Sequence, residues 1–244
     1  RDDLYLPIFV GAYGKEDIGF QRDDEGENIS KLNPSYCELT AQYWAWKNLD
    51  AGYIGLVHYR RHFALKKTKN PLDGVLSFDD LQPSLGKVRI FVPKRRRYYI
   101  ETLYSHYAHT MSADHLDKAK AIIAKQCPEY SDSFERAIMK STSGYMFNMM
   151  IAEQEMFSEY CTWLFDILFE LRKKLSEEEK NLVEQYAAEI DVANVNQVIK
   201  YGADAQRNIS DFSFYLHRSQ YRLSNLQMHR KLHLFQPCLQ FEKL

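Results

Sequence analysis

The sequence predicts an α/β fold: an open sheet flanked by helices, with a helical C-terminal portion. Residues 4–10 and 54–59 are short, apolar, β-rich runs. Between them, residues 35–49 repeat large apolar side chains at three- and four-residue steps, which indicates a helix. Strand, helix and strand joined by short connections are the start of a layered α/β structure. A further run, VRIFVPK at 88–94, alternates like a strand and extends the predicted sheet.

Helical spacing dominates the rest of the chain. Residues 98–108 and 114–125 are predicted helices, 145–149 is a predicted strand, and a long amphipathic helix is predicted from 153 to 175. The tail from Glu177 onward is polar and predicted to be mostly helical.

The domain organisation follows from these elements. We expect one domain over 1–175 and a helical C-terminal extension of the same domain over 176–244.

Composition narrows the class of protein. The chain has 244 residues with 32 Lys and Arg against 33 Asp and Glu, and 45% of them are hydrophobic, which suits a globular protein with a sizeable core. The balanced charge argues against a nucleic-acid-binding protein.

The cysteines do not have the spacing of a metal site or a disulfide framework. Cys37, Cys127, Cys161 and Cys238 form no CxxC pair, which predicts reduced thiols in a cytoplasmic protein and no structural zinc site. No apolar run approaches the ~18 residues of a membrane span.

Two cationic clusters come directly after predicted strands. The run HYRRH at 58–62 follows one strand, and Lys94–Arg97 follows another. Ligands of open α/β sheets bind beyond the carboxyl ends of the strands, and guanidinium groups bind phosphate through paired, charge-assisted hydrogen bonds. If the two strands are neighbours, both clusters point into one cleft suited to a nucleotide diphosphate. The alternative, a pair of solvated basic edges, stays open.

Aromatic and imidazole side chains gather in a second group, at Tyr104, His106, Tyr107 and His109, with Asp114 nearby. His106 and His109 are three residues apart and could share one helical face as metal ligands, but no carboxylate lies at a matching helical step. A hydrogen-bonding wall that faces the substrate, simple packing and a metal site therefore all stay open. The sequence contains no GxGxxG, GxSxG or HExxH motif, which argues against Rossmann dehydrogenases, α/β-hydrolases and zincins.

The stretch GENISKLNPSYCELTAQYWAWKNLDAGYIGLVHYRRHF, residues 26–63, closely resembles the signature of bacterial capsular and exopolysaccharide glycosyltransferases. The likeness continues through VPKRRRYYIETLYSHYAHT and YMFNMMIAEQEMFSEYCTWLFDILFEL, and covers the chain from 4 to 175. Members of this family are similar to GT-A-type glycosyltransferases, and some transfer galactofuranose. The resemblance implies a GT-A-like fold and an enzyme that moves a sugar, galactofuranose or galactose, from a nucleotide donor to a growing surface polysaccharide.

The resemblance also implies which residues lie at or near the active cleft: Asn28, Asn33, Glu38, Trp44, His58, Tyr59, Arg60, Arg61, His106 and Tyr107. The residues expected to hold the donor diphosphate are Asn28, His58, Tyr59, Arg60, Arg61, Lys94 and Arg95. Those expected to contact the acceptor are Trp44, Tyr107 and His109. The candidates for the catalytic base are Glu38, His106 and Asp114, and the sequence does not choose among them.

Many GT-A enzymes use an Asp-x-Asp motif and a divalent metal, whereas His-Tyr-Arg-Arg stands here after the second strand. We expect Arg60 and Arg61, with Lys94 or Arg95, to replace the metal partly or wholly. No metal ligand is assigned, and Mn²⁺ or Mg²⁺ stays open as a cofactor. The expected partners are a UDP-sugar and a glycan or lipid-linked glycan acceptor, with no nucleic acid. Peripheral contact with the inner membrane face through the basic tail at 217–233 also stays open.

Two departures from the family pattern affect these expectations. Family members usually begin with an additional strand that ends in a THK-like segment, and this chain starts just after it, so we expect part of the donor site to be missing. Near the C-terminus, Phe214 and Tyr215 occupy the places of a Glu and an Arg. A second function therefore stays open: a non-catalytic module, derived from the same fold, that binds a sugar nucleotide or a glycan.

Overall fold

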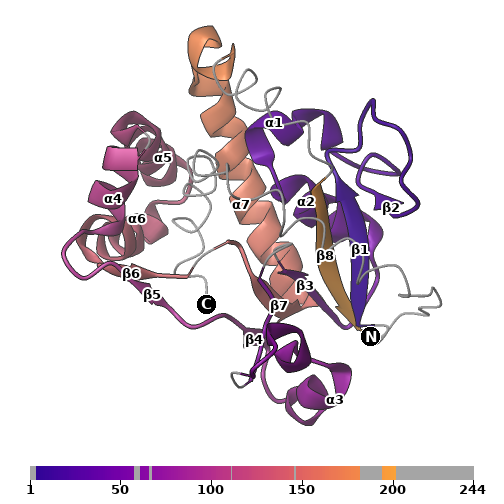
Figure 1. The fold of residues 1–244 in the computed structure, drawn as a ribbon. Helices are drawn as coiled ribbons and strands as arrows, with labels where there is room; N and C mark the ends of the chain where they lie inside the picture. The colour runs from indigo at the N-terminus through magenta and orange to yellow at the C-terminus, as the bar shows by residue number, and fades with distance from the viewer. Residues whose placement is uncertain are drawn as a thin grey trace. The chain divides into compact units, whose positions relative to one another are not determined.

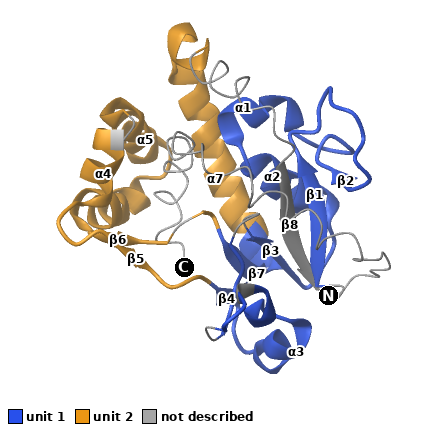
Figure 2. Cartoon of the chain, viewed as in Figure 1, with its two compact units in different colours: residues 1–91, 149–157, 192–228 blue, residues 92–148, 158–191, 229–244 orange. Residues whose placement is uncertain are grey.

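The structure, a computed structural model, describes residues 4–57, 61–65, 68–110, 112–145, 147–181 and 194–201 (Figure 1). These residues form two compact units, which Figure 2 colours separately. Unit 1 contains the described residues up to Phe91, together with 149–157 and 194–201. Unit 2 contains the described residues in 92–148 and in 158–181.

Unit 1 is built around an open sheet that, among the described residues, has six strands in the order β2-β1-β8-β3-β7-β4. Its strands are β1 (Tyr5–Val10), β2 (Gln21–Arg22), β3 (Tyr53–Val57), β4 (Ile90–Phe91), β7 (Met150–Glu153) and β8 (Asn194–Tyr201). β1 to β4 all run in one direction, and β7 and β8 run antiparallel to them. All five residues of β3 are buried. Gly55 of β3 allows β7 to approach closely, because a Cβ at this position would lie 2.3 Å from the carbonyl oxygen of Met150.

The helices of unit 1 are α1 (Asn33–Tyr36), α2 (Leu39–Asn48) and α3 (Phe78–Leu81), with 3-10 turns at Ser30–Leu32, Pro71–Gly74 and Gln82–Ser84. α2 packs against β1, β3 and β8 and buries Leu39, Ala41 and Ala45. The single helix predicted over 35–49 is divided in two, because Cys37 has a φ of 48° and ends α1. α3 begins with a capping box in which Ser77 and Asp80 satisfy each other's backbone N–H groups.

Unit 2 is mainly helical. Its helices are α4 (Leu103–Thr110), α5 (Ala113–Gln126), α6 (Ser131–Phe134), a π-helix (Glu135–Lys140), a 3-10 turn (Pro128–Tyr130) and the part of α7 (Gln154–Lys174) that begins at Ser158. A two-stranded ribbon, β5 (Arg96–Arg97) and β6 (Ser143–Gly144), completes it. Leu116, Ile122, Ile123 and Ile138 are almost fully buried in its core. No helix in the described parts of the chain has the length and the apolar composition that a membrane span requires.

The predicted α/β open sheet with flanking helices is confirmed, with local corrections. The strand predicted at 145–149 is wrong: Phe147 and Asn148 have φ angles of 69° and 50°, so extended pairing begins only at Met150. The strand predicted at 88–94 is reduced to Ile90 and Phe91. The helical prediction for the tail is wrong at 194–201, which forms β8, between β1 and β3. The C-terminal predictions for Phe214, Tyr215 and 217–233 concern residues outside those that the structure describes.

Candidate functional site

The sheet of unit 1 has one edge at which the carboxyl ends of its parallel strands meet. β1 ends at Val10, β3 at Val57 and β4 at Phe91, and the antiparallel strands β7 and β8 begin at the same edge. We call this the carboxyl edge. Open α/β sheets bind their ligands there, so the loops that follow β1 and β3 are the first candidates for a site.

The loop after β1 is fixed by Asp23, whose side chain is fully buried. The backbone N–H groups of Gly11 and Ala12 donate to its two carboxylate oxygens at 2.8 and 2.9 Å. The hydroxyls of Ser30 and Thr40 donate to the same two oxygens, each at 2.5 Å. Four donors therefore satisfy a buried charge that would otherwise be very unfavourable.

These hydrogen bonds occupy the backbone N–H groups that many nucleotide-binding loops use to bind phosphate. Gly11 and Ala12 point their N–H groups at Asp23, and the N–H of Tyr13 donates to the Ser30 hydroxyl at 3.1 Å. Gly11 has a φ of +66°, and a Cβ on it would lie 2.4 Å from Oδ1 of Asn33, so only glycine fits. The N–H groups of Gly11, Ala12 and Tyr13 are therefore not available to an anionic ligand at the carboxyl edge.

The residues that resemble the family signature fasten the 23–33 loop onto α2. Asn28 donates to the carbonyls of Asp24 and Gly26, both at 2.9 Å, and the indole N–H of Trp44 donates to the carbonyl of Glu25 at 2.9 Å. Trp44 is only 5% exposed. The polar groups of Asn28 and Trp44 thus have partners within unit 1, and their expected roles in donor and acceptor binding stay predictions.

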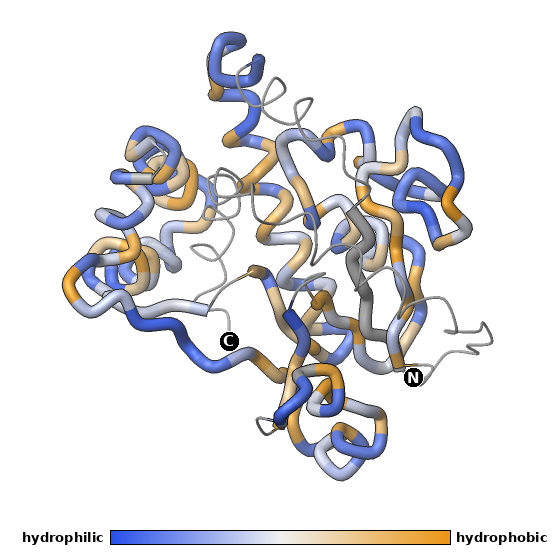
Figure 3. Tube along the Cα trace, viewed as in Figure 1, coloured by the Kyte–Doolittle hydropathy of each residue, from blue (hydrophilic) through white to orange (hydrophobic). Residues whose placement is uncertain are grey.

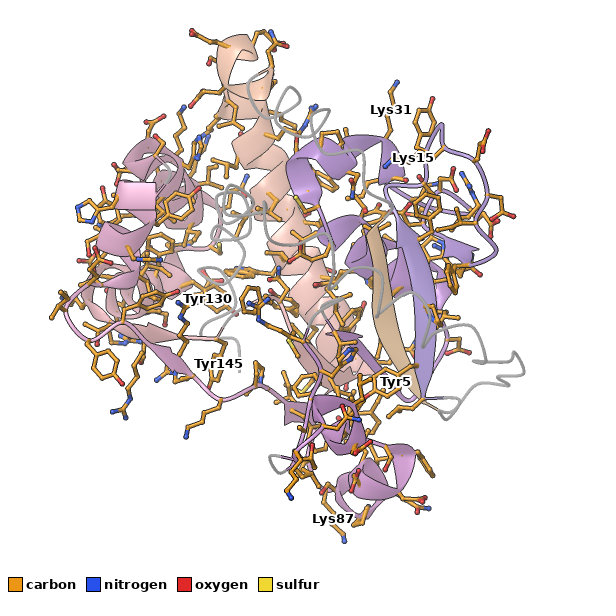
Figure 4. The ribbon with its side chains drawn as sticks, in the orientation of Figure 1. Tyr5, Lys15, Lys31, Lys87, Tyr130 and Tyr145 are labelled. Carbon is orange, nitrogen blue, oxygen red and sulfur yellow. The ribbon has the colours of Figure 1, made fainter. Side chains whose placement is uncertain are left out.

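The cationic run after β3 is only partly described. His58, Tyr59 and Arg60 follow Val57 directly in the chain but lie outside the described residues. Arg61 is exposed. Lys94 and Arg95 are both exposed and belong to unit 2, where the guanidinium of Arg95 lies 5.2 Å from the ring centroid of Tyr145 (Figure 4). The expectation that the two cationic clusters share one cleft therefore stays a prediction.

Glu38 is a buried carboxylate in unit 1. Glu38 is the N-cap residue of α2, but its side chain makes no capping hydrogen bond, and the residue is 3% exposed. Burial, followed by the charge of Glu38, raises the pKa of the neighbouring Cys37 thiol, so this cysteine is not a thiolate nucleophile.

The remaining candidates for the catalytic base and for acceptor binding belong to unit 2: His106, Tyr107, His109 and Asp114. Nδ1 of His106 and Nδ1 of His109 lie 2.8 Å from the two carboxylate oxygens of Glu101, and the His106 ring stacks 4.2 Å from that of Tyr98. Hydrogen bonds from His106 and then His109 lower the pKa of Glu101 below its ordinary value. Sequence reasoning missed Glu101, because it sits in the turn before α4 and not at a helical step from the histidines.

Tyr107 and Asp114 have structural partners in unit 2. Tyr107 is 2% exposed, and its hydroxyl lies 3.1 Å from Nδ1 of His115. A carboxylate oxygen of Asp114 lies 2.6 Å from Nζ of Lys118. Among the side chains that the structure describes, no group of three His, Cys, Asp or Glu residues is arranged to hold a metal ion.

Asn148 is a buried polar residue that sequence reasoning also missed. It is 0% exposed, and neither of its side-chain amide atoms has a hydrogen-bond partner among the described residues. It follows Phe147 in a pair of left-handed residues, two positions before β7. Buried polar groups without partners and strained backbone both concentrate at functional sites. The available signal was a lone amide inside the apolar run at 146–152.

His62 gives unit 1 a pH-sensitive stability. Both of its ring nitrogens are buried without a hydrogen-bond partner among the described residues, and its ring meets the edge of Tyr5 at 6.3 Å (Figure 4 labels Tyr5). Burial lowers the pKa of His62 below its ordinary value of 6.5. As the pH falls below 6.5, the His62 ring is therefore protonated in the unfolded chain before it is protonated in the folded chain. The free energy of unfolding decreases from there down to the pKa of the folded state.

We predict that His62→Phe, which keeps a ring but cannot titrate, makes the free energy of unfolding less dependent on pH. Below pH 6.5, the slope of the free energy of unfolding against pH should fall by up to about 1.4 kcal/mol per pH unit. Urea unfolding of both proteins across this range checks the prediction. Parallel stability curves for the variant and the wild type would show that His62 does not carry the effect.

Comparison with known proteins adds to this geometry. A family model described as "Domain of unknown function (DUF4422)" matches residues 1–190. No curated protein matches the chain. Among solved structures, the chain is similar to the apo structure of WbbM, a bifunctional glycosyltransferase, with a TM-score of 0.64 and 28% sequence identity. The match covers 84% of this chain and 44% of WbbM, so the chain spans less than half of that protein. The predicted fold class, a GT-A-like α/β open sheet flanked by helices, is confirmed.

Proposed function

Since the chain belongs to the DUF4422 family and resembles WbbM over most of its length, we propose that it is a glycosyltransferase that uses a nucleotide-sugar donor. The proposed reaction moves a sugar, galactose or galactofuranose, from a UDP-sugar to a glycan or lipid-linked glycan acceptor of surface-polysaccharide assembly. The likeness to WbbM carries the proposal of sugar transfer, and the residues of this chain support the assignment of the donor site.

The loop after β1 supports a donor site built from side-chain cations. Departure of a nucleoside diphosphate requires donors that stabilise the charge developing on its phosphate oxygens. The N–H groups of Gly11 and Ala12 are already used by Asp23, so they cannot supply this stabilisation without loss of the buried network. Arg60 and Arg61, which come just past the end of β3, have the forked geometry that binds phosphate.

Three side chains remain candidates for the base that accepts the proton of the acceptor hydroxyl. Glu38 is a buried carboxylate, whereas Asp114 is ion-paired with Lys118 and His106 is held by Glu101. A base must come within hydrogen-bond reach of the acceptor hydroxyl. We retain all three, and a divalent metal, Mn²⁺ or Mg²⁺, stays open as an additional source of charge stabilisation.

Asn148 is proposed to contact a sugar hydroxyl. A side-chain amide offers two N–H donors and a carbonyl acceptor, and each sugar hydroxyl can both donate and accept. Because Asn148 is 0% exposed, a sugar reaches its amide only if neighbouring groups move aside, and the ligand would then satisfy the amide atoms that have no partner among the described residues. The cost of keeping this polar group buried would then be recovered on binding.

We predict that Asn148→Leu lowers the rate of sugar transfer but leaves the free energy of unfolding nearly unchanged. Removal of the unsatisfied amide offsets the cost of leucine in a left-handed conformation, so the free energy of unfolding should stay within about 1 kcal/mol of the wild type. Sugar transfer should fall by about tenfold or more, because one hydrogen bond to the substrate is lost. Thermal melting and initial rates measure the two effects.

Asn33→Leu is the matched control. The Asn33 amide donates to the carbonyl of Cys37 at 2.9 Å and to the hydroxyl of Thr40 at 3.2 Å, so its loss should destabilise unit 1 by about 2 kcal/mol. Equal destabilisation by both substitutions, or full activity of Asn148→Leu, would remove Asn148 from the site.

Release of UDP from UDP-galactose and UDP-galactofuranose, measured with a glycan acceptor in the presence and absence of Mn²⁺, tests the proposed function. We expect acceptor-dependent release of UDP. Binding of UDP-sugars without turnover would instead support the second function, a non-catalytic module for sugar nucleotides. Absence of both binding and turnover would contradict the proposed function.

A further inference from the structure

A basic and apolar protrusion stands on the ribbon of unit 2. We call Arg96, Arg97, Tyr99 and Ile100 the β5 tip. Tyr99 is 84% exposed and Ile100 is 94% exposed, the two highest values for large hydrophobic side chains among the described residues. Adjacent apolar side chains that are fully exposed indicate an interaction surface more often than isolated ones do.

The base of the protrusion is held in place. On one side, the N–H of Tyr98 donates to the carbonyl of Thr142 at 2.8 Å, and on the other, the N–H of Leu103 donates to the carbonyl of Ser141 at 2.9 Å. Within the turn, the N–H of Ile100 donates to the carbonyl of Tyr98 at 2.8 Å, and Tyr99 adopts a left-handed φ of 64°. The turn that exposes these apolar side chains therefore contains a strained backbone conformation, at Tyr99.

The charge next to these side chains is positive. Arg96 and Arg97 pair with Gly144 and Ser143 across the ribbon, and both are exposed. Figure 3 shows the hydrophilic run that leads along β5 into a hydrophobic turn. None of the cations in Lys94–Arg97 forms an ion pair with a described acidic residue, and the nearby carboxylate of Glu101 is engaged by His106 and His109.

We propose that the β5 tip docks this protein onto an anionic lipid bilayer. Guanidinium groups would contact headgroup phosphates, and Tyr99 and Ile100 would enter the boundary between headgroups and acyl chains, where aromatic and aliphatic side chains are favoured beside basic ones. An anionic polysaccharide would be attracted by the arginines but offers no apolar phase for Tyr99 and Ile100 to enter, and an acidic protein as the partner instead of a bilayer is an outcome that the vesicle test below would expose. The inference goes beyond sugar transfer and does not depend on it.

Sedimentation of the full chain with lipid vesicles tests the proposal. We expect binding to vesicles of phosphatidylcholine mixed with phosphatidylglycerol, and weak binding to phosphatidylcholine alone. The Arg96→Ala/Arg97→Ala variant should partition about 25-fold less into the anionic vesicles, because each cation contributes about fivefold. Tyr99→Ser/Ile100→Ser should also reduce binding by about tenfold or more.

Two matched controls change the same residue types elsewhere. Lys173→Ala/Lys174→Ala removes two exposed cations from the last turn of α7, and Leu65→Ser removes an apolar side chain that is 72% exposed. Both controls should bind as the wild type does, and all four variants should keep the melting temperature of the wild type, because the substituted side chains are exposed.

Three outcomes would overturn the proposal. The first is no binding of the wild type to anionic vesicles. The second is equal loss of binding in the control variants and the tip variants. The third is normal binding by Tyr99→Ser/Ile100→Ser together with competition by a free anionic polysaccharide, which would show a site for polyanions.

Discussion

Asp23→Ala is expected to lower the free energy of unfolding by about 4 kcal/mol, and with it the melting temperature by roughly 10 °C. The substitution leaves two backbone N–H groups and two hydroxyls, from Gly11, Ala12, Ser30 and Thr40, buried without their acceptor. A buried donor without a partner costs about 1–3 kcal/mol, and partial relaxation of the loop recovers some of the sum.

Asp17→Ala is the control for this prediction. Asp17 lies in the same loop and is exposed, and its carboxylate accepts one hydrogen bond, from the N–H of Gly19 at 2.9 Å. Its loss should change the free energy of unfolding by less than about 0.5 kcal/mol. If Asp23→Ala and Asp17→Ala melt at the same temperature, Asp23 does not organise the loop after β1.

Arg60→Ala/Arg61→Ala is expected to weaken the binding of UDP by about 100-fold or more while the fold stays intact. Each charge-assisted contact between a guanidinium and a phosphate contributes about 1.5–3 kcal/mol, and two such contacts would be lost. Titration calorimetry with UDP measures the affinity, and thermal melting checks the fold.

Arg89→Ala is a matched control in unit 1. This arginine is exposed and binds Glu153 at 2.6 Å and Glu155 at 3.3 Å, so we expect it to have no part in donor binding. Unchanged affinity for UDP in the double variant would show that the arginines after β3 do not receive the diphosphate.

Local sequence patterns predicted the elements whose burial follows a simple period. β1, β3, α5 and α7 lie close to the predicted ranges, because β1 and β3 are short continuous apolar runs and the apolar side chains of α5 and α7 recur at helical steps. β8 was missed. The run NVNQVIKY mixes polar residues with valine, isoleucine and tyrosine without a clear period, and its position between β1 and β3 is fixed by pairing with strands far away in the sequence.

Backbone conformation explains two further differences. The left-handed φ of Cys37 splits one predicted helix into α1 and α2, and those of Phe147 and Asn148 delay β7. Residues such as cysteine and phenylalanine adopt this conformation rarely, and asparagine adopts it more readily but not at predictable positions, so the sequence gives little warning.

In the candidate site, too, features set by neighbouring residues in the sequence could be predicted, and features set by tertiary contacts could not. That the cationic run follows a buried strand was predictable, and β3 ends at Val57, directly before it. The hydrogen bonds from Asn28 and Trp44 to the 23–33 loop could not be predicted. Residue type alone does not distinguish a contact with a ligand from an internal hydrogen bond. Glu101 and Asn148 were missed because their significance depends on tertiary contacts.

A crystal structure of this protein with UDP bound would show which groups hold the diphosphate. We predict that a guanidinium group of Arg60 or Arg61 lies within hydrogen-bond distance of the diphosphate, while the N–H groups of Gly11 and Ala12 remain on Asp23. A diphosphate held by those two backbone N–H groups, with both arginines directed away from it, would contradict the account.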